Sequence, residues 1–151
     1  MKFDHILSAD RVACNLSVAS KKKALEELSQ LLSKGVEGIS QNDVFSSLIG
    51  REKLGSTGLG HGVAIPHGRV AGISGSVGAF VKLQHPVDYD AHDGQAVDLV
   101  FGLLVPQEAN QEHLQHLAAI AEMFSDEKTC EQLRAADDAD ALLQQLLDSA
   151  K

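Results

Sequence analysis

The chain has 151 residues, a length that fits one domain, residues 1–151, and can bury a hydrophobic core without disulfides or metals. Its formal net charge of -8 weighs against broad nucleic-acid binding, because phosphate backbones are usually met by clustered Lys and Arg. The longest apolar run, residues 97–106, is interrupted by Asp98 and Gly102 and is too short to span a bilayer. We therefore expect no membrane insertion, and partners among proteins or small molecules.

The N-terminal segment, residues 1–10, lacks the uninterrupted apolar stretch of a signal peptide and carries Asp4 and Asp10. This composition predicts a protein that stays in the cytoplasm. The two cysteines, Cys14 and Cys130, lie far apart in the sequence and form no metal-binding or redox spacing. We expect both to be free thiols, with Cys14 a small buried residue.

Two amphipathic helices are predicted in the first third of the chain. Residues 20–34 carry apolar side chains at helical spacing and are followed by Gly35, a common residue at helix ends. Ser40, with Asp43 three residues later, resembles a capping box in which Asp replaces Glu or Gln. It begins a second helix that we expect to end near residues 51–54, next to a glycine-rich segment.

Two strands are predicted in the middle of the chain, over residues 77–83 and 97–105, because both runs are rich in β-branched and apolar residues. The second run is apolar at nearly every position, which is typical of a strand covered on both faces. Helices before, between and after these strands predict an α/β sandwich.

After Pro106 the apolar period becomes helical. Asn110 can cap a helix, and its predicted buried stripe consists of Leu114, Leu117, Ala118 and Ala121. Two shorter helices are predicted over residues 126–135 and 138–147, each opened by acidic residues that favour a helix N-terminus.

Residues 56–69 form a glycine-rich loop and a short apolar run that present His67 between Pro66 and Gly68. Pro66 fixes its own φ, and Gly68 permits a turn and the close approach of another backbone, so the imidazole is expected at a rigid, accessible corner. A neutral imidazole has a lone pair and, with a reference pKa of about 6.5, can attack phosphorus without a separate base. His67 is therefore the predicted nucleophile, and its attacking nitrogen stays open.

Phosphoryl transfer requires mainly positioning and stabilisation of charge on the phosphoryl oxygens. Arg51 and Arg69 are two of the four arginines and offer hydrogen-bond donors. Residues 58–62 could expose backbone N–H groups, and Ser56 or Thr57 could donate a hydroxyl. Each arginine taken alone is better explained as a solvated surface charge, whereas the three features together favour function.

His113 is predicted at the third position of the helix that follows Asn110, where free backbone N–H groups and the helix dipole favour an anion. A second imidazole there could donate to a phosphoryl group. The alternative, favoured by spacing alone, is an exposed histidine in the first turn of a helix. His116, one turn further on, is expected to be structural or exposed.

Other chemistries fit the glycine-rich segment less well. No Gly-Lys-Ser or Gly-Lys-Thr follows the glycines, so direct use of ATP or NAD is not expected and no cofactor is predicted. His61 and His67 could converge on a metal, but no Cys, Asp or Glu stands at ligand spacing nearby. We therefore expect no metal and favour phosphoryl transfer.

Residues 62–69, Gly-Val-Ala-Ile-Pro-His-Gly-Arg, together with Arg51, residues 56–58 and residues 112–114, resemble the fructose/mannitol-type (EIIA type-2) proteins of the bacterial phosphoenolpyruvate-dependent phosphotransferase system. The resemblance runs along nearly the whole chain. The segment at residues 20–28 is more similar to the nitrogen-regulatory branch than to the sugar-specific one. This resemblance implies a single-domain mixed β-sheet flanked by helices on both faces.

The resemblance also implies an activity. His67 would accept a phosphoryl group, as tele-phosphohistidine, from an HPr-like phosphohistidine carrier of the nitrogen type, with Arg51 and His113 matching the assisting residues of the family. The phosphorylation state would regulate target proteins such as a potassium transporter or a sensor kinase. His61 stands where we expect asparagine in this family, which alters the hydrogen bonding expected in the loop.

Two alternatives remain open from the sequence. In the first, the protein is a sugar-specific IIA component that passes its phosphoryl group to a IIB protein for fructose, mannitol or a related substrate. The absence of an attached IIB domain supports regulation only modestly. In the second, the protein is a binding module whose histidine loop is structural or holds a metal.

Overall fold

The fold is built around β6 (Val97–Pro106), a strand whose side chains are buried on both faces of a mixed sheet. In this computed structural model, which describes residues 3–150, alternate residues of β6 enter two separate core clusters. Leu99 and Leu103 belong to one cluster, and Val100 and Leu104 belong to the other. The prediction that this strand is covered on both faces is therefore confirmed.

Within residues 3–150 the sheet has six strands, with β4 paired to β6 outside the order β1-β5-β6-β3-β2. β5 is antiparallel to β6, β1 is parallel to β5, and β2 is antiparallel to β3. The strands besides β6 are β1 (Val12–Leu16), β2 (Gly58–Gly60), β3 (Val63–Ala64), β4 (His67–Val70) and β5 (Val77–Val87). β5 continues beyond the predicted residue 83, and β1 to β4 were not predicted.

β3 and β4 lie one after the other along the same side of β6, both parallel to it. Val63 is paired with Leu99 and His67 with Leu103. Between them stands Pro66, which has no N–H to donate to a ladder, although its carbonyl accepts the Leu103 N–H at 3.0 Å. The proline thus separates the two short strands, and His67 becomes the first residue of the second.

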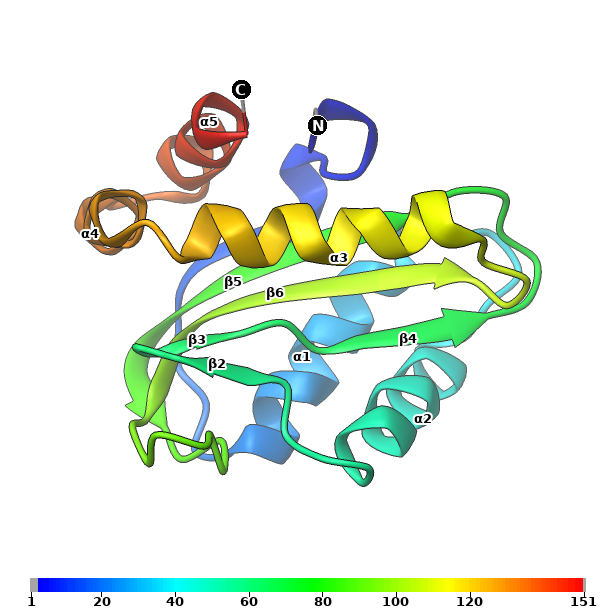
Figure 1. Cartoon of the computed structure of the whole chain (residues 1–151), viewed down its shortest axis with the longest axis horizontal. Coiled ribbons are helices and arrows are strands. Elements are labelled where there is room, and N and C mark those ends of the chain that lie inside the picture. Colours follow the sequence, from blue (N-terminus) through cyan, green and yellow to red (C-terminus); the bar gives the residue numbers. More distant parts are fainter. Residues whose placement is uncertain (1–2, 151) are drawn as a thin grey trace.

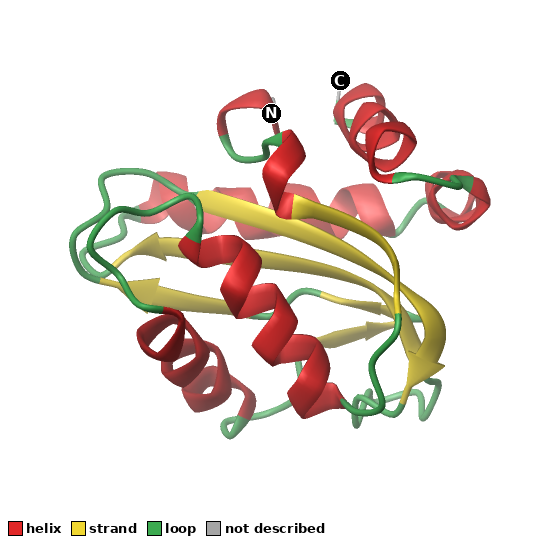
Figure 2. Ribbon diagram, turned by 180° about the vertical axis from the view of Figure 1, so that it is seen from behind, coloured by secondary structure: helices red, strands yellow, loops and turns green. Residues whose placement is uncertain are grey.

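One face of the sheet is covered by α1 (Lys21–Ser33) and α2 (Gln41–Glu52), as Figures 1 and 2 show from opposite sides. Both predicted helices are confirmed. The side chains of Ser20 and Ser40 each accept the backbone N–H of the third residue that follows, which satisfies a donor with no partner inside the helix.

The other face is covered by α3 (Gln111–Phe124), α4 (Glu127–Ala135) and α5 (Ala139–Ser149), with the short 3-10 turns η1 (Phe3–His5) and η2 (Ala9–Arg11) (Figure 1). Asn110, Asp126 and Asp138 are the N-caps, so these predicted helices are also confirmed. Helices on both faces of a mixed sheet confirm the predicted fold class.

The predicted buried stripe of α3 is wrong in part. Ile120, Met123 and Phe124 carry the burial, Leu114 is 43% exposed, and Ala118 is also exposed. The physical reason is that only the C-terminal half of α3 packs into the core. In its N-terminal half, Leu114 lines a cavity next to His67 instead of entering the core.

The two cysteines are free thiols, as predicted. Cys130 is buried in α4, and Cys14 is half-buried rather than fully buried, because it lies on the edge strand β1. None of the helices in the described part of the chain is long and apolar enough to cross a membrane.

Candidate functional site

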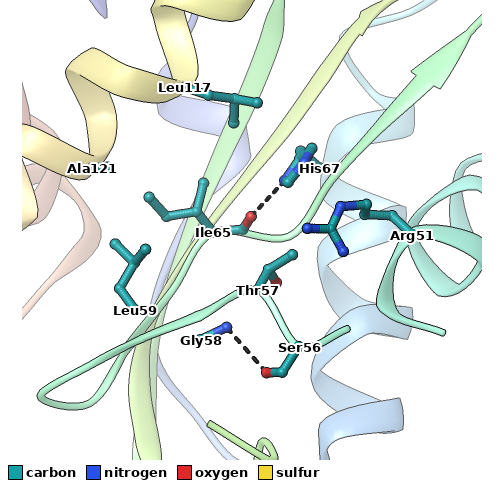
Figure 3. A pocket seen from close by; sticks show the side chains of 9 residues that line it. All are labelled: Arg51, Ser56, Thr57, Gly58, Leu59, Ile65, His67, Leu117 and Ala121. Atoms are coloured by element: carbon teal, nitrogen blue, oxygen red, sulfur yellow. Dashed lines mark hydrogen bonds between the residues drawn. The ribbon is translucent and has the colours of Figure 1, made fainter. Parts of the chain in front are cut away.

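His67 is half-buried at the start of β4, and its Nδ1 lies 2.9 Å from the carbonyl oxygen of Ile65 (Figure 3). A carbonyl oxygen only accepts hydrogen bonds, so this contact assigns the proton of the neutral imidazole to Nδ1. The lone pair then lies on Nε2. The contact depends on the turn at Ile65 and Pro66, which is imposed by the break between β3 and β4.

The surroundings of His67 favour its neutral form. Burial lowers the pKa of His67 below its ordinary value; the hydrogen bond to the Ile65 carbonyl partly opposes this, and the positive charge of Arg51 lowers it further. The imidazole is therefore neutral at pH 7. A neutral imidazole with a free Nε2 lone pair is a competent nucleophile.

In the part of the chain that the structure describes, His67 lines the walls of two cavities. The first has a volume of about 240 Å³, and its wall is formed by Arg51, Ser56, Thr57, Gly58, Leu59, Ile65, His67, Leu117 and Ala121 (Figure 3). The second, of about 370 Å³, is lined by residues of α2, β4 and α3 that include Arg51, Arg69 and Leu114. His67, Arg51 and Leu117 line both, so the imidazole and one guanidinium share the space where a ligand would lie.

Arg51 comes from the last turn of α2 and donates from Nη1 to the carbonyl of Gly55 at 2.9 Å. Figure 3 shows its guanidinium pointing into the space between His67 and Thr57. A guanidinium has five N–H donors, so several remain available to an oxyanion.

Arg69 and Gly68, which follow His67, have different environments. Arg69 is exposed, lines the second cavity and donates to the carbonyl of Gln107 at 3.3 Å. Gly68 is buried, and a Cβ there would come within 3.0 Å of the Cβ of Ser47 on α2. Since Ser47 also donates to the Arg69 carbonyl at 2.9 Å, Gly68 allows α2 to pack closely on β4. This packing brings Arg51 to His67.

Ser56 and Thr57 form part of the cavity wall, but their hydroxyl protons have internal partners. The Ser56 hydroxyl donates to the Tyr89 carbonyl at 3.0 Å and accepts the Gly58 N–H at 3.1 Å. The Thr57 hydroxyl donates to the carboxylate of Glu52. In this structure the two side chains shape the loop, whereas the sequence led us to expect donors to a phosphoryl group.

Two of the backbone N–H groups that residues 58–62 were expected to offer to an anion, those of Gly58 and His61, are bonded within the protein. Gly58–Gly60 forms β2, and the Gly58 N–H bonds to Ser56. The His61 N–H donates to the Asp93 carboxylate at 2.9 Å. The glycines are used for a tight turn, since Gly60, His61 and Gly62 all have positive φ.

His113 is the third residue of α3 and forms a capping box with Asn110, because its Nδ1 accepts the Asn110 N–H at 3.4 Å. The proton of its neutral ring therefore lies on Nε2, which is available as a donor. Among residues 3–150, His113 lines neither cavity beside His67. His116 packs edge-on against it, and its Nδ1 lies 2.8 Å from the Ser76 hydroxyl.

Sequence reasoning missed a buried polar cluster behind the first cavity. The Glu52 side chain, only 4% exposed, pairs with Lys21 at 3.0 Å and accepts the Thr57 N–H at 3.1 Å. The Lys21 ammonium lies 4.5 Å from the ring centre of Tyr89, whose own pKa is raised mainly by burial. Glu52 follows Val44 and Leu48 at four-residue spacing, and a carboxylate on that apolar face was the available signal.

His61 and His67 line different cavities, and His61 shares its own with Cys130 and Arg134. Within residues 3–150 no group of three or more His, Cys, Asp or Glu side chains is arranged to hold a metal ion.

Residues 5–149 match the model of the family described as "Phosphoenolpyruvate-dependent sugar phosphotransferase system, EIIA 2". The nitrogen regulatory protein of Pseudomonas aeruginosa is 41% identical over 148 residues, which cover 98% of this chain and 96% of the relative.

Solved structures of IIA proteins are also similar to this chain. The crystal structure of the nitrogen regulatory protein IIA-Ntr from Neisseria meningitidis is 42% identical, with a TM-score of 0.88 and 97% coverage of both chains. The crystal structure of IIA mannitol from Escherichia coli is 26% identical, with a TM-score of 0.76, covering 93% of this chain and 98% of that one. The chain belongs to the EIIA 2 family of the phosphotransferase system and is similar over nearly its whole length to nitrogen regulatory members of that family.

Proposed function

We propose that the protein, acting as a single domain of residues 1–151, is a phosphoryl carrier in which Nε2 of His67 accepts a phosphoryl group. The donor is an HPr-like phosphohistidine protein of the nitrogen type. Membership of the EIIA 2 family supports the carrier role in general. The observation that carries the assignment to His67 is the contact between its Nδ1 and the Ile65 carbonyl, which leaves Nε2 with the lone pair beside a cavity.

The reaction is an exchange of one nitrogen–phosphorus bond for another. The Nε2–phosphorus bond forms as the donor's nitrogen–phosphorus bond breaks, and the electron pair of the broken bond returns to the donor's imidazole. His67 keeps its Nδ1 proton during the attack. The Ile65 carbonyl then stabilises the positive charge that develops on the ring.

The negative charge on the phosphoryl oxygens is stabilised mainly by Arg51, which lines both cavities beside His67. His113 lines neither cavity beside His67, and we propose it as a second donor, through its Nε2–H, because the helix dipole at the N-terminus of α3 favours an anion there. Arg69 adds a positive charge at the rim of the second cavity.

We further propose that the output is regulatory and takes place in the cytoplasm. Leu54, Leu59 and Leu114 are 85%, 39% and 43% exposed, and each lines one of the cavities beside His67. A phosphoryl group among them would change protein docking by its charge and its hydration. Targets such as a potassium transporter or a sensor kinase would then distinguish the two states.

The first test mixes the purified protein with phosphoenolpyruvate, enzyme I and a nitrogen-type histidine phosphocarrier, and measures intact mass. The wild type should gain one phosphoryl group, and His67→Ala should gain none. Uptake by His67→Ala would show that another residue is the acceptor. No uptake by the wild type from nitrogen-type or sugar-type carriers would favour a binding module.

A second candidate is a sugar-specific IIA component, which the similarity to the mannitol IIA structure favours. The phosphorylated protein would then lose its label rapidly to a IIB protein for fructose, mannitol or a related sugar. Retention of the label in the presence of these IIB proteins supports the regulatory role.

A further inference from the structure

A continuous chain of hydrogen bonds runs from α1 to the imidazole of His67. Lys21 Nζ lies 3.0 Å from Glu52, and the Glu52 carboxylate accepts both the N–H and the hydroxyl of Thr57. The Thr57 carbonyl accepts the Ile65 N–H at 3.1 Å, and the Ile65 carbonyl accepts Nδ1–H of His67 at 2.9 Å. Each hydrogen bond restrains the next group, so the orientation of His67 depends on Glu52 and Lys21, which do not line the cavity.

The part of this hydrogen-bond chain around Glu52 and Thr57 is buried and held rigidly. The Glu52 side chain is 4% exposed, and its partner Lys21 is 20% exposed. The Tyr89 hydroxyl lies 3.3 Å from Thr57 Oγ1, so Thr57 is contacted from two sides. A buried polar network with every member satisfied fixes a single arrangement of its groups.

Stability alone gives little reason to keep an ion pair here. Replacing a buried ion pair by well-packed apolar side chains is often neutral or stabilising, because the charges no longer have to be desolvated. A carboxylate, in contrast, can accept from the N–H and the O–H of Thr57 at once, which no apolar side chain can do.

We propose that Glu52 is a positioning residue for His67, acting through Thr57 and Ile65 to keep the proton on Nδ1 and the lone pair on Nε2. Glu52 does not contact the reacting atoms. Its kinetic consequence rests on the proposed phosphoryl transfer, whereas the tautomer of His67 is a property of the unphosphorylated protein and is tested without any donor.

The primary experiment records the imidazole nitrogen signals of His67 by NMR at a pH where the ring is neutral, with the signals assigned by their loss in His67→Ala. In Glu52→Gln the amide offers one acceptor oxygen in place of two, so Thr57 loses a partner. The ratio of the Nδ1–H to the Nε2–H form should then fall about fivefold, the change expected for one net hydrogen bond.

The matched control is Asp98→Asn. Asp98 is also a partly buried carboxylate in an ion pair, with Arg134 at 2.9 Å, but it lies outside the hydrogen-bond chain to His67. It should lose stability without any change in the tautomers of His67. An unchanged tautomer ratio in Glu52→Gln would overturn the proposal, as would an equal change in both variants.

Thr57→Val provides a second route if Glu52→Gln does not fold, because it removes one hydroxyl and keeps the shape of the side chain. It should lower the tautomer ratio in the same direction, and an unchanged ratio would overturn the proposal. If the wild type accepts phosphate, the rate at saturating donor should also fall about tenfold in Glu52→Gln, with KM for the donor unchanged. If the wild type accepts none, the proposed function fails and the tautomer result still stands.

Discussion

Arg51, beside the site, and Arg134, on α4, differ in how many guanidinium donors they use in hydrogen bonds within the protein. Arg134 donates from Nε and Nη2 to the Asp98 carboxylate at 2.9 to 3.2 Å, and from Nη2 to the His61 carbonyl at 2.8 Å. Arg51, within the described part of the chain, donates once, to the Gly55 carbonyl. The Arg134 guanidinium is largely satisfied by the protein, while most donors of the Arg51 guanidinium have no hydrogen-bond partner among residues 3–150.

The same contrast extends to the neighbours of the two arginines. Close to Arg134, the Lys82 ammonium donates to the carbonyls of Arg134 and Ala136 at 2.6 and 2.7 Å and so caps the C-terminal end of α4. Close to Arg51, His67 leaves Nε2 free. The comparison teaches that the two arginines differ in their unused donors more than in their exposure, and this difference is the reason to propose Arg51 as the binding residue.

The largest effect that separates the two arginines is expected for Arg51→Ala. The rate of phosphorylation of His67 should fall about 100-fold, because one donor to the transferring group is lost. The free energy of unfolding should change by less than about 0.5 kcal/mol, since Arg51 makes one hydrogen bond at a half-exposed position. Rates from rapid-quench phosphorylation and urea denaturation measure the two quantities. A loss of stability with an unchanged rate would make Arg51 structural.

Arg134→Ala should show the reverse pattern. Asp98 and the His61 carbonyl lose their donor, and the free energy of unfolding should fall by about 2 kcal/mol, less than for a fully buried pair because both side chains are partly exposed. The phosphorylation rate should stay within about twofold of the wild type. A rate loss as large as that of Arg51→Ala would remove the distinction between the two arginines.

The pH dependence sharpens the comparison. Since burial lowers the pKa of His67, the phosphorylation rate should be constant from pH 8 to about 6.5, the ordinary value, and should fall below the folded-state pKa as the lone pair is protonated. The unfolded chain takes up this proton first on acidification. The stability that His67 contributes is therefore complete above about pH 6.5 and is lost as the pH falls towards the folded-state pKa.

An NMR titration of His67 in the two arginine variants tests the electrostatic part of this prediction. Arg51 lowers the pKa of His67, so Arg51→Ala should raise it towards its ordinary value. Arg134→Ala should leave it unchanged. If the two variants shifted the pKa of His67 equally, the charge of Arg51 would not act on His67 directly.

The features that the sequence predicted correctly are those set by neighbouring residues. Ser40 and Asn110 cap helices because a side-chain oxygen reaches an N–H three residues away, which needs no other part of the chain. The continuous apolar run of β6 indicated burial on both faces for a similarly local reason. His67 is also marked by its neighbours, Pro66 and Gly68, and its role as phosphoryl acceptor stays a prediction.

The features that the sequence did not predict depend on long-range pairing. β3 has two residues and exists because β6, more than thirty residues later, pairs with it. The contact of Thr57 with Tyr89 could not be predicted from neighbouring residues, since Tyr89 comes from a distant loop. The exposure of Leu114 follows from where α3 leaves the core, which helical periodicity alone does not determine.

The smallest expected effect lies at His61, the histidine that stands in place of the expected asparagine. Its φ of 57° lies in the left-handed region, which asparagine adopts more readily than most residues. His61→Asn should therefore raise the free energy of unfolding by about 0.5 kcal/mol, and the β-branched His61→Val should lower it by more than about 1 kcal/mol. Thermal and urea unfolding measure both, and a destabilised His61→Asn would show that the imidazole itself holds the turn.

His61→Asn also tests whether Arg134 constrains the turn at His61. The turn at His61 is held by the Asp93 carboxylate on its N–H and by Arg134 on its carbonyl. These two contacts impose the left-handed conformation on the histidine. In an Arg134→Ala background one of them is lost, so the turn can relax and the gain from His61→Asn should shrink. A double-mutant cycle on unfolding free energies measures that coupling, and strict additivity would mean that Arg134 stabilises α4 without constraining the turn.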